Sequence, residues 1–374
     1  MANPLRPRSQ SWLKVHPTLL GVPLLALVLT GCASRPQRVA TSSGEPVPYV
    51  RIVHPDEETI QLQIASRRFS PGRGKGPAVW LVGASHIGEP AFFAALQKQL
   101  DGHTVVLYEG VGEHSRRTRP ASATGQVPQR APLMKKHADT NDTPYSLQDT
   151  MAKSLGLVFQ LEAIDYERTN FVNSDLSIAE IQALMQPGRP LANSSTRPGT
   201  ASHRQPASTS GDDDDSNSSF QSLMSAMDGR SALGVLLKGV MQLIGNSPKL
   251  QAMTKIVLIE TLGAMKADPS RLKGLPADMK QLMEVLIRER NKTVIDDLKQ
   301  ELKRTRPGDS IAIFYGAGHL TDLEMRLRKE LRFRPTQDIW LPAFSVNTAK
   351  AGLSNFELNF LRSMIRSQLA PLTE

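Results

Sequence analysis

The 374-residue sequence contains a single cysteine, Cys32. One sulfur cannot form an intramolecular disulfide, a thiolate zinc cluster or an iron–sulfur centre, because each of these needs several sulfurs. Aromatic residues make up only 5% of the chain, which argues against a stacking platform for single-stranded nucleic acid. Any metal ion bound within this chain must therefore be held by nitrogen and oxygen.

The apolar run near the N-terminus, Leu19–Thr30, is shorter than the roughly 20 residues that a lasting transmembrane helix needs. It follows a segment with three basic residues and no acidic one, and it ends in Leu29-Thr30-Gly31-Cys32. A basic segment, a short apolar run and small residues before a cleavage point are typical of a secretory signal. We expect residues 1–31 to be a signal peptide.

The segment Leu29-Thr30-Gly31-Cys32 resembles a bacterial lipobox, in which the cysteine becomes the acylated first residue of the mature protein. Dual acylation would anchor the chain stably, since one acyl chain alone binds membranes only marginally. Ala33 stands where an aspartate would favour retention in the inner membrane, so we expect the outer membrane, facing the periplasm. The alternative is an ordinary signal peptide with an unrelated cysteine.

Basic residues outnumber acidic ones by 45 to 36, for a net charge of +9. Removal of residues 1–31 takes away three basic and no acidic side chains, so the net charge falls to +6. Such a surface suits contact with anionic lipid headgroups, although an ordinary solvated surface is the simplest explanation. We expect no nucleic-acid partner, because the sequence shows neither a dense basic helix nor basic residues interleaved with aromatics.

Short apolar runs that alternate with helical spacing predict an α/β fold, with a mostly parallel central sheet flanked by helices. After a flexible tether over residues 32–47, we expect one α/β domain over residues 48–374. Its composition predicts a polar loop at 113–144, a disordered insertion at 187–219 and a helical insertion at 220–275.

The expected strands and helices alternate along the chain. The strands are Tyr49–His54 and Thr59–Phe69 as a hairpin, then Ala78–Val82, Thr104–Tyr108, Val158–Tyr166, Ser310–Tyr315 and an edge strand at Asp338–Leu341. The helices are Glu89–Leu100, Ser146–Leu157, one that begins after Ser177, one within Pro276–Arg304, Leu320–Leu331 and Asn355–Leu369. Ser177 and Glu180 are spaced as a capping box.

Polar side chains follow three of the expected buried strands. His86 and His319 each close a Gly-x-x-His segment that starts at Gly83 or Gly316, and Glu109 directly follows the strand between them. The carboxyl ends of parallel strands meet at one edge of a sheet, where ligands bind. Two histidines and a glutamate are a plausible set of three ligands for a divalent metal, with a position left open for water or substrate.

Plainer roles exist for the same residues. A histidine after a strand can bond a backbone carbonyl, and Glu109 can pair with an arginine. Arg288 and Arg290 lie on different faces of the long helix that precedes the strand Ser310–Tyr315. Only one of them, together with Asn291, can therefore reach the site. That arginine could stabilise an oxyanion or orient Glu109. An ordinary charged helix face is the alternative.

The order and spacing of these segments resemble the TraB/GumN family, which is related to the Tiki proteases. The matching segments are Gly83-Ala84-Ser85-His86, Tyr108-Glu109-Gly110, Glu289-Arg290-Asn291 and Gly316-Ala317-Gly318-His319-Leu320. The resemblance covers roughly residues 76–335 without the polar insertions. It implies a fold like that of erythromycin esterase and the haem-binding lipoprotein ChaN.

The resemblance also implies roles for single residues. His86, Glu109 and His319 would bind the metal, with Arg290 and Asn291 as accessory polar residues. We assign Gly83 and Gly316 to the cofactor-binding turns. Tiki-type members are proteases that use manganese or cobalt, and zinc is a further candidate. The substrate would be a peptide or protein, and the oligomeric state is not predicted.

Three segments depart from the family pattern. They are Ala84-Ser85 before the first histidine, Val294 after the Arg-Asn pair and Thr321-Asp322 after the last motif. These differences lie in the lining of the site, so the substrate is left open. Two rivals to a metal-dependent hydrolase have the same fold: a lipoprotein that binds haem or another ligand, with histidine as an axial ligand, and an inactive envelope interaction protein.

Overall fold

The computed structural model describes residues 46–110, 147–185, 232–264 and 282–373. The predictions for the signal peptide, Cys32 and the tether up to residue 45 concern residues outside these ranges. So do the predicted polar loop at 113–144, the predicted disorder at 187–219 and parts of the predicted insertion at 220–275. Within the described ranges, no helix has both the length and the apolar composition needed to cross a bilayer.

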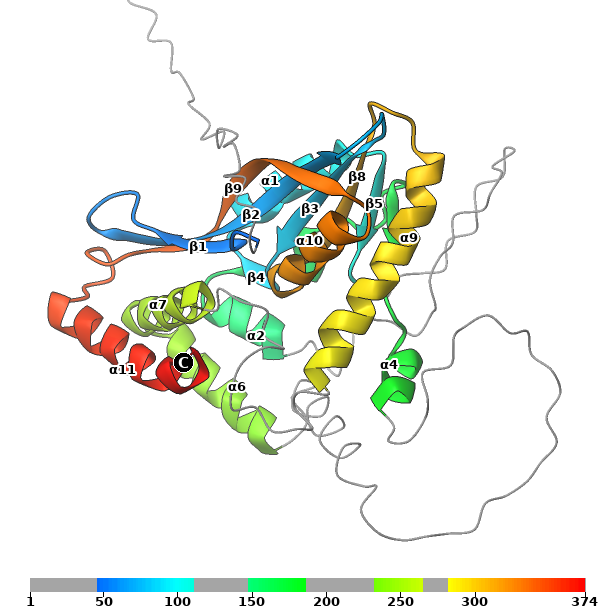
Figure 1. Cartoon of the computed structure of the whole chain (residues 1–374). Helices are drawn as coiled ribbons and strands as arrows, with labels where there is room; N and C mark the ends of the chain where they lie inside the picture. The colour runs from blue at the N-terminus through cyan, green and yellow to red at the C-terminus, as the bar shows by residue number, and fades with distance from the viewer. Residues whose placement is uncertain (1–45, 111–146, 186–231, 265–281, 374) are drawn as a thin grey trace, which may run out of the picture. The chain divides into compact units, whose positions relative to one another are not determined.

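The chain has the predicted α/β fold, with a mixed, mostly parallel seven-stranded sheet flanked by helices (Figure 1). Its parallel part contains four strands, which lie in the order β3 (Ala78–Ala84), β8 (Ser310–Gly316), β5 (Val105–Tyr108) and β7 (Phe171–Asn173). Because these strands run the same way, their carboxyl ends meet at one edge.

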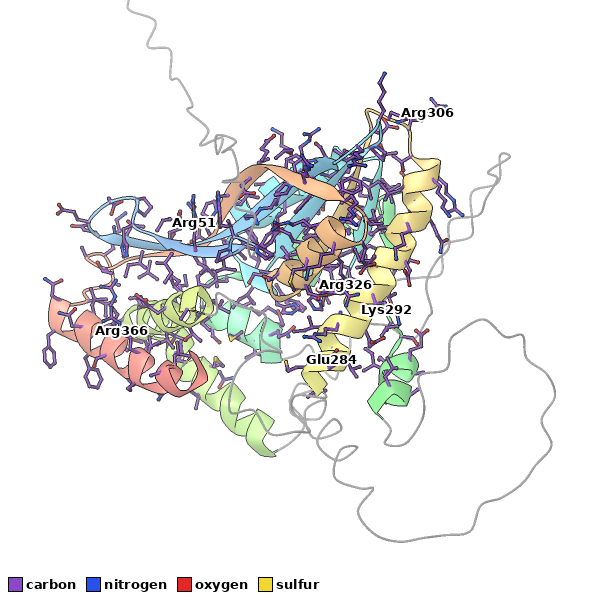
Figure 2. The ribbon with its side chains drawn as sticks, viewed as in Figure 1. Arg51, Glu284, Lys292, Arg306, Arg326 and Arg366 are labelled. Atoms are coloured by element: carbon purple, nitrogen blue, oxygen red, sulfur yellow. The ribbon has the colours of Figure 1, made fainter. Side chains whose placement is uncertain are left out.

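An antiparallel region extends the sheet beyond β3. The predicted hairpin forms from β1 (Val50–Val53) and β2 (Thr59–Pro71), and the second half of β2 pairs with β3. β9 (Phe333–Asn347) covers the other side of β2 along its whole length. Arg51 on β1, labelled in Figure 2, lies with its guanidinium 4.1 Å from the ring centre of Trp340 on β9.

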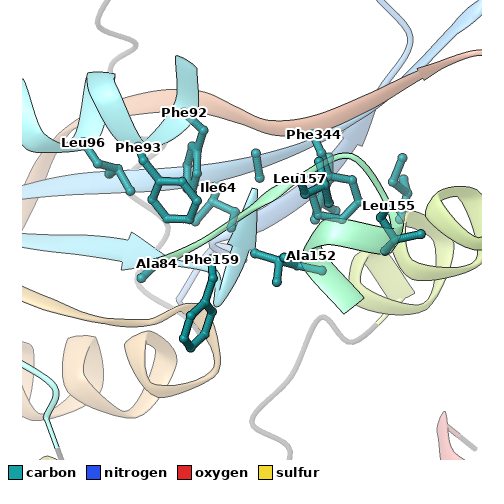
Figure 3. Close-up of a cluster of buried hydrophobic side chains, with 14 of the residues drawn as sticks. Ile64, Ala84, Phe92, Phe93, Leu96, Ala152, Leu155, Leu157, Phe159 and Phe344 are labelled. Atoms are coloured by element: carbon teal, nitrogen blue, oxygen red, sulfur yellow. The ribbon is translucent and has the colours of Figure 1, made fainter. Parts of the chain in front are cut away.

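One face of the sheet carries a large apolar core (Figure 3). Alternate strand residues such as Val106 and Phe314 point to this face and are fully buried there. Four helices contribute to the same core: α1 (Pro90–Asp101), α2 (Leu147–Ser154), α7 (Pro248–Ala264) and α11 (Asn355–Thr373). From α1, Phe92 and Phe93 pack edge to face, with ring centres 5.1 Å apart.

The opposite face of the sheet packs against two helices. α9 (Arg290–Arg304) and α10 (Leu320–Lys329) bury Val294, Leu298 and Leu323 against the remaining alternate strand residues, such as Leu107 and Ile313. Both faces of the parallel strands are thus covered, as their continuous apolar sequences require. Figure 1 shows α9 passing close to β5 and β8, which brings the start of α9 near the carboxyl ends of these strands.

The predicted strand Val158–Tyr166 is wrong. Only β6 (Val158–Phe159) is extended, as a short pair with β4 (Ile87–Gly88), and α3 (Gln160–Ala163) follows at once. The strand that joins the parallel sheet is β7, which occupies the next extended segment. The apolar run at 157–159 is buried by packing on α1 and α2 and does not belong to the large sheet.

The predicted edge strand Asp338–Leu341 is much too short, because β9 spans Phe333–Asn347. Pro335 and Pro342 interrupt the sequence pattern that would have indicated its length. Both prolines lie where the β2–β9 pairing shifts register, at Phe69 and Gln63 of β2. An edge strand with bulges can accept prolines, since a missing N–H need not break its ladder.

Other local predictions are confirmed. α4 (Ile178–Met185) begins with the predicted capping box, in which the Glu180 N–H donates to Ser177 Oγ at 3.2 Å and the Ser177 N–H donates to Glu180 Oε2 at 2.8 Å. The described part of the helical insertion contains α6 (Ala232–Gly245) and α7. Gly308 makes the predicted turn before β8 with φ of 99°.

A buried arginine joins β2, β9 and α10. Arg67 on β2 is fully buried and binds Asp338 of β9 through two bonds, with Nε–Oδ1 at 2.7 Å and Nη2–Oδ2 at 2.8 Å. Its Nη1 donates to Glu324 of α10 at 2.7 Å, and the Tyr49 hydroxyl donates to the same carboxylate at 2.7 Å. The Asp338 and Glu324 carboxylates therefore share one cation in the interior.

Replacement of Arg67 by leucine tests the contribution of this cluster to stability. We expect a loss of about 3–5 kcal/mol in the free energy of unfolding, because Asp338 is left buried without its cation and Glu324 keeps only a longer pair with Arg328, at 3.4 Å. The neighbouring Arg68→Leu is the control, since Arg68 is only partly buried and bonds hydroxyl groups of Ser70 and Thr336. Urea denaturation followed by circular dichroism measures both, and equal losses would contradict the assignment.

Candidate functional site

Glu109 follows the last residue of β5 and points to the adjoining end of β8. The Gly316 N–H donates to its Oε2 at 2.7 Å, and the Arg290 guanidinium donates to its Oε1 at 2.7 Å. A Cβ at position 316 would lie 3.2 Å from Oε2, so glycine leaves the space in which this carboxylate fits. Burial alone would raise the pKa of Glu109, but His319, Arg290, the Gly316 amide and His86 together lower it from 4.5 to about 2. Glu109 is therefore ionised at neutral pH.

Arg290, the first residue of α9, binds two carboxylates at once. Its Nε and Nη2 form a two-bonded pair with Asp175 at 2.8 and 2.7 Å, and Nη2 also reaches Glu109. Asp175 follows β7, so this guanidinium joins the ends of β5 and β7. Burial would lower the pKa of Arg290, but the bonds to Asp175 and the charge of Glu109 raise it above its ordinary value. The side chain is a permanent cation.

The helix that carries Arg290 begins with a wide turn, η2 (Glu284–Glu289), which has π-helical hydrogen bonding. Such turns displace one residue relative to an α-helix and are frequent at functional sites. Arg290 Nη1 donates to the Leu286 carbonyl at 3.3 Å within this turn. Arg288 instead is partly exposed and pairs with Glu284 at 3.2 Å. Of the two arginines considered from the sequence, Arg290 is the one that enters the site.

Asn291 fixes the orientation of His319. Its amide nitrogen donates to the His319 carbonyl at 3.1 Å and to Asp322 Oδ2 at 2.9 Å, which identifies its Oδ1 as an acceptor. His319 Nδ1 lies 2.8 Å from this Oδ1 and so carries the proton. Burial lowers the pKa of His319, and the imidazole is neutral at pH 7 with the lone pair on Nε2.

His319 Nε2 and Glu109 Oε1 are 3.6 Å apart, which is too far for a hydrogen bond. At neutral pH both atoms are acceptors, so they face each other without a proton to share. The side chains are 10% and 18% exposed, so both are mostly buried and keep a small part of their surface open to solvent. Glu109 Oε1 already accepts from Arg290 Nη2, and a cation, a proton or a water molecule between the two atoms would also give His319 Nε2 a partner.

His86 lies at the same edge of the sheet, after β3, but is exposed. Its charge contributes to the lowered pKa of Glu109, which places it within electrostatic range. Gly83 is buried inside β3, where a Cβ would come within 2.5 Å of Ile64 and 2.9 Å of the Ala65 carbonyl. Glycine at 83 therefore allows close packing of β3 on β2.

The structure brings together Glu109, Arg290, Asn291 and His319, with His86 beside them. Among the described side chains, no three His, Cys, Asp or Glu residues are grouped closely enough to form a metal-binding cluster. Cys32 lies outside the described residues. Because thiolates are excluded, the groups that could hold a cation here are the Nε2 atom of His319, the carboxylate of Glu109 and the imidazole of His86.

Asp175 was not predicted as a site residue, and neither was Asp322. Asp175 stands two residues after Phe171-Val172-Asn173, a segment with an aromatic and a β-branched residue that could have been read as a further strand with an acid just after its end. Asp322 orients Asn291 and is itself paired with Arg326 at 2.7 Å. The sequence marked Thr321-Asp322 only as a departure from the family pattern, and nothing in it distinguished Asp322 from Glu324, the other acid of α10, as a partner of Asn291.

No protein-family model, curated protein or solved structure matches this chain.

Replacement of Arg290 by leucine is expected to lower the free energy of unfolding by about 3–5 kcal/mol, because Asp175 and Glu109 lose their shared cation. The control is Arg288→Leu, two residues earlier on the same helix. Arg288 is 37% exposed with a surface partner, so we expect a loss of no more than about 1 kcal/mol. Urea titration of the two variants and the wild type measures the difference, and similar values for both would refute this account of Arg290.

The lowered pKa of Glu109 predicts a specific acid sensitivity. A carboxylate with a pKa of 4.5 when unfolded and about 2 when folded stabilises the fold above pH 4.5, and this contribution is lost as the pH falls toward 2. The full loss is about 3 kcal/mol. Glu109→Gln lacks the titrating group, so its stability should fall less between pH 5 and pH 2. Urea titrations across this range compare the two chains, and parallel pH profiles would contradict the prediction.

Proposed function

We propose that this chain is a lipid-anchored cell-envelope protein of TraB/GumN type that acts as a divalent-metal-dependent hydrolase on peptides or proteins. Acylation at Cys32 would attach it to a membrane, and the outer membrane facing the periplasm is the expected place. The assignment to metal-dependent hydrolysis rests on the segments that resemble the family. The geometry of the described site supports a cation-dependent reaction independently of that resemblance.

A single observation carries the proposal: the unprotonated Nε2 of His319 faces Glu109 Oε1 across 3.6 Å, and no hydrogen bond joins the two atoms. The net charge of the surrounding groups also favours a bound cation. Arg290 contributes one positive charge, Asp175 and Glu109 contribute two negative charges, and His319 is neutral. The interior of the site thus has an excess of one negative charge, which favours a bound cation.

The donor atoms fit a divalent metal. Imidazole nitrogen suits zinc, cobalt and similar ions, while carboxylate oxygen suits manganese. A histidine that binds a metal through Nε2 usually donates its Nδ1–H to a fixed oxygen, as His319 does to Asn291. His319 and Glu109 would hold the ion. His86 would become the third ligand only after its side chain moves, because the three side chains are not grouped closely enough in this structure. A bound metal of this kind lowers the pKa of water and polarises a scissile carbonyl.

The remaining residues hold the site in shape. Arg290 and the Gly316 amide fix the two oxygens of Glu109 in place and keep the carboxylate ionised. Glu109 could act as a ligand or as the general base for a water molecule, and both roles need that ionised form. Because the Arg290 guanidinium is occupied by Asp175 and Glu109, it acts as a positioning residue and not as an oxyanion donor.

The test is metal binding by the purified chain, measured calorimetrically with Mn²⁺, Co²⁺ and Zn²⁺. We expect one ion per chain, no measurable binding by His319→Ala, and about 10- to 100-fold weaker binding by Asn291→Leu, which frees the imidazole to rotate. His54→Ala is the control, since His54 is exposed in the β1–β2 turn. Binding that is unchanged in His319→Ala would refute the metal site.

The reaction is tested separately with a diverse peptide library in the presence of the bound metal. We expect cleavage by the wild type and at least about 100-fold less by His319→Ala and Glu109→Gln, as is usual for the loss of a metal ligand or general base. Equal turnover by wild type and His319→Ala would refute the hydrolase assignment. A haem Soret shift that disappears with His86→Ala would support the ligand-binding alternative instead.

A further inference from the structure

The C-terminal helix α11 presents an apolar ridge to solvent. Phe356 is 80% exposed, Phe360 61% and Met364 37%. Their spacing of four residues places one side chain per turn on the same side of the helix. Surface phenylalanines are normal when scattered singly, but a row of large apolar side chains on one helix marks an interaction site.

The ridge is held outward by the contacts on the other side of α11. Leu358, Leu361 and Ile365 are buried, and the helix packs on α7. Two ion pairs connect the same helices, Lys249 with Glu357 at 2.6 Å and Arg362 with Glu260 at 2.9 Å. The exposed phenyl groups therefore belong to a fixed surface of a packed helix and are not a frayed end.

The charges beside the ridge favour an anionic partner. The exposed residues between and next to the apolar ones are Asn359, Ser363, Ser367 and Arg366, the last of which is labelled on α11 in Figure 2. The one acid of the helix, Glu357, is held by Lys249 and by the Ser354 capping box. The ridge is thus bordered by uncharged and cationic groups, as in helices that lie on anionic lipid surfaces.

The area of the ridge argues against a second copy of the chain as its partner. An aromatic side chain buries roughly 150–250 Å², so the exposed parts of these three side chains offer roughly 400 Å². A stable protein interface needs about 800 Å² from each partner. Insertion of a few aromatic side chains into a membrane interface needs no matching protein surface.

We infer that α11 is a membrane-docking helix whose ridge of Phe356, Phe360 and Met364 inserts into the lipid surface to which the chain is anchored. The choice of a membrane as partner rests on the proposed acylation at Cys32. Thirteen residues separate Cys32 from the first described residue, Pro46, so they reach at most about 50 Å. Anchored this way, the domain stays close to the bilayer, which makes a weak second contact effective.

The test places a fluorescent probe on the ridge. Phe356→Trp is introduced into the full chain, which is isolated from membranes and reconstituted into phosphatidylglycerol-containing vesicles with or without brominated acyl chains. Because the chain has three tryptophans of its own, the spectrum of the unsubstituted chain is subtracted, and we expect the difference emission from position 356 to shift to shorter wavelength and to lose intensity with brominated lipid. Leu161→Trp is the matched control, because Leu161 is an exposed apolar residue (54%) on α3, and its emission should change little. Adding Phe360→Ser to Phe356→Trp should reduce the quenched fraction, since loss of one buried phenyl weakens insertion about tenfold or more.

Two outcomes would overturn the inference. Emission at 356 that matches the water-exposed control would show that the ridge stays in solvent. A shifted emission that brominated lipid does not quench would show that protein covers the ridge, as in a dimer. Mass spectrometry of the N-terminal peptide tests acylation at Cys32 separately. If the chain carries no acyl groups but its fluorescence is still quenched when it is mixed with vesicles, the anchoring proposal fails and the docking helix stands. An unchanged urea midpoint for Phe356→Trp confirms that the fold is intact.

Discussion

The bond network of Arg290 determines the arrangement of the site. One guanidinium binds Asp175 after β7 and Glu109 after β5, and it lies at the start of the helix that also carries Asn291. The guanidinium stays charged in this buried place, and its charge helps to hold the pKa of Glu109 below its ordinary range. The helix is in turn placed so that Asn291 meets His319. If this cation were absent, the carboxylates would repel each other, and the strand ends and the helix would lose their common contact.

The order of the parallel strands explains why residues far apart in sequence converge. β8 lies between β3 and β5, so the segment that carries His319 is next to both His86 and Glu109. The sequence was sufficient to predict this convergence, because three apolar runs each end in a polar residue and two of them share Gly-x-x-His. It was also sufficient to restrict Arg288 and Arg290 to different helix faces. These inferences depend on the spacing of apolar residues within short segments, which is regular in this sequence.

What the sequence could not predict depends on tertiary contacts. Val158–Tyr166 has the composition of a strand, yet only two residues of it are extended, because helices bury its apolar side chains. β7 has three residues, too few for a periodic signal, so nothing in the sequence showed that Asp175 follows a strand. β9 contains two prolines, which usually end a strand, and only its pairing with the bulges of β2 explains its length.

The two buried arginines show how a structural ion cluster differs from a candidate site. Around Arg67, both carboxylates are at most 6% exposed, and the guanidinium and Tyr49 supply donors to them, so this cluster is complete in itself. Around Arg290, the Glu109 carboxylate is 18% exposed and faces a histidine lone pair across 3.6 Å. Glu109 Oε1 accepts from Arg290 there, while His319 Nε2 makes no hydrogen bond to it. The cluster around Arg290 therefore differs from the cluster around Arg67 in two ways: it is partly open to solvent, and it leaves His319 Nε2 facing Glu109 Oε1 without a hydrogen bond.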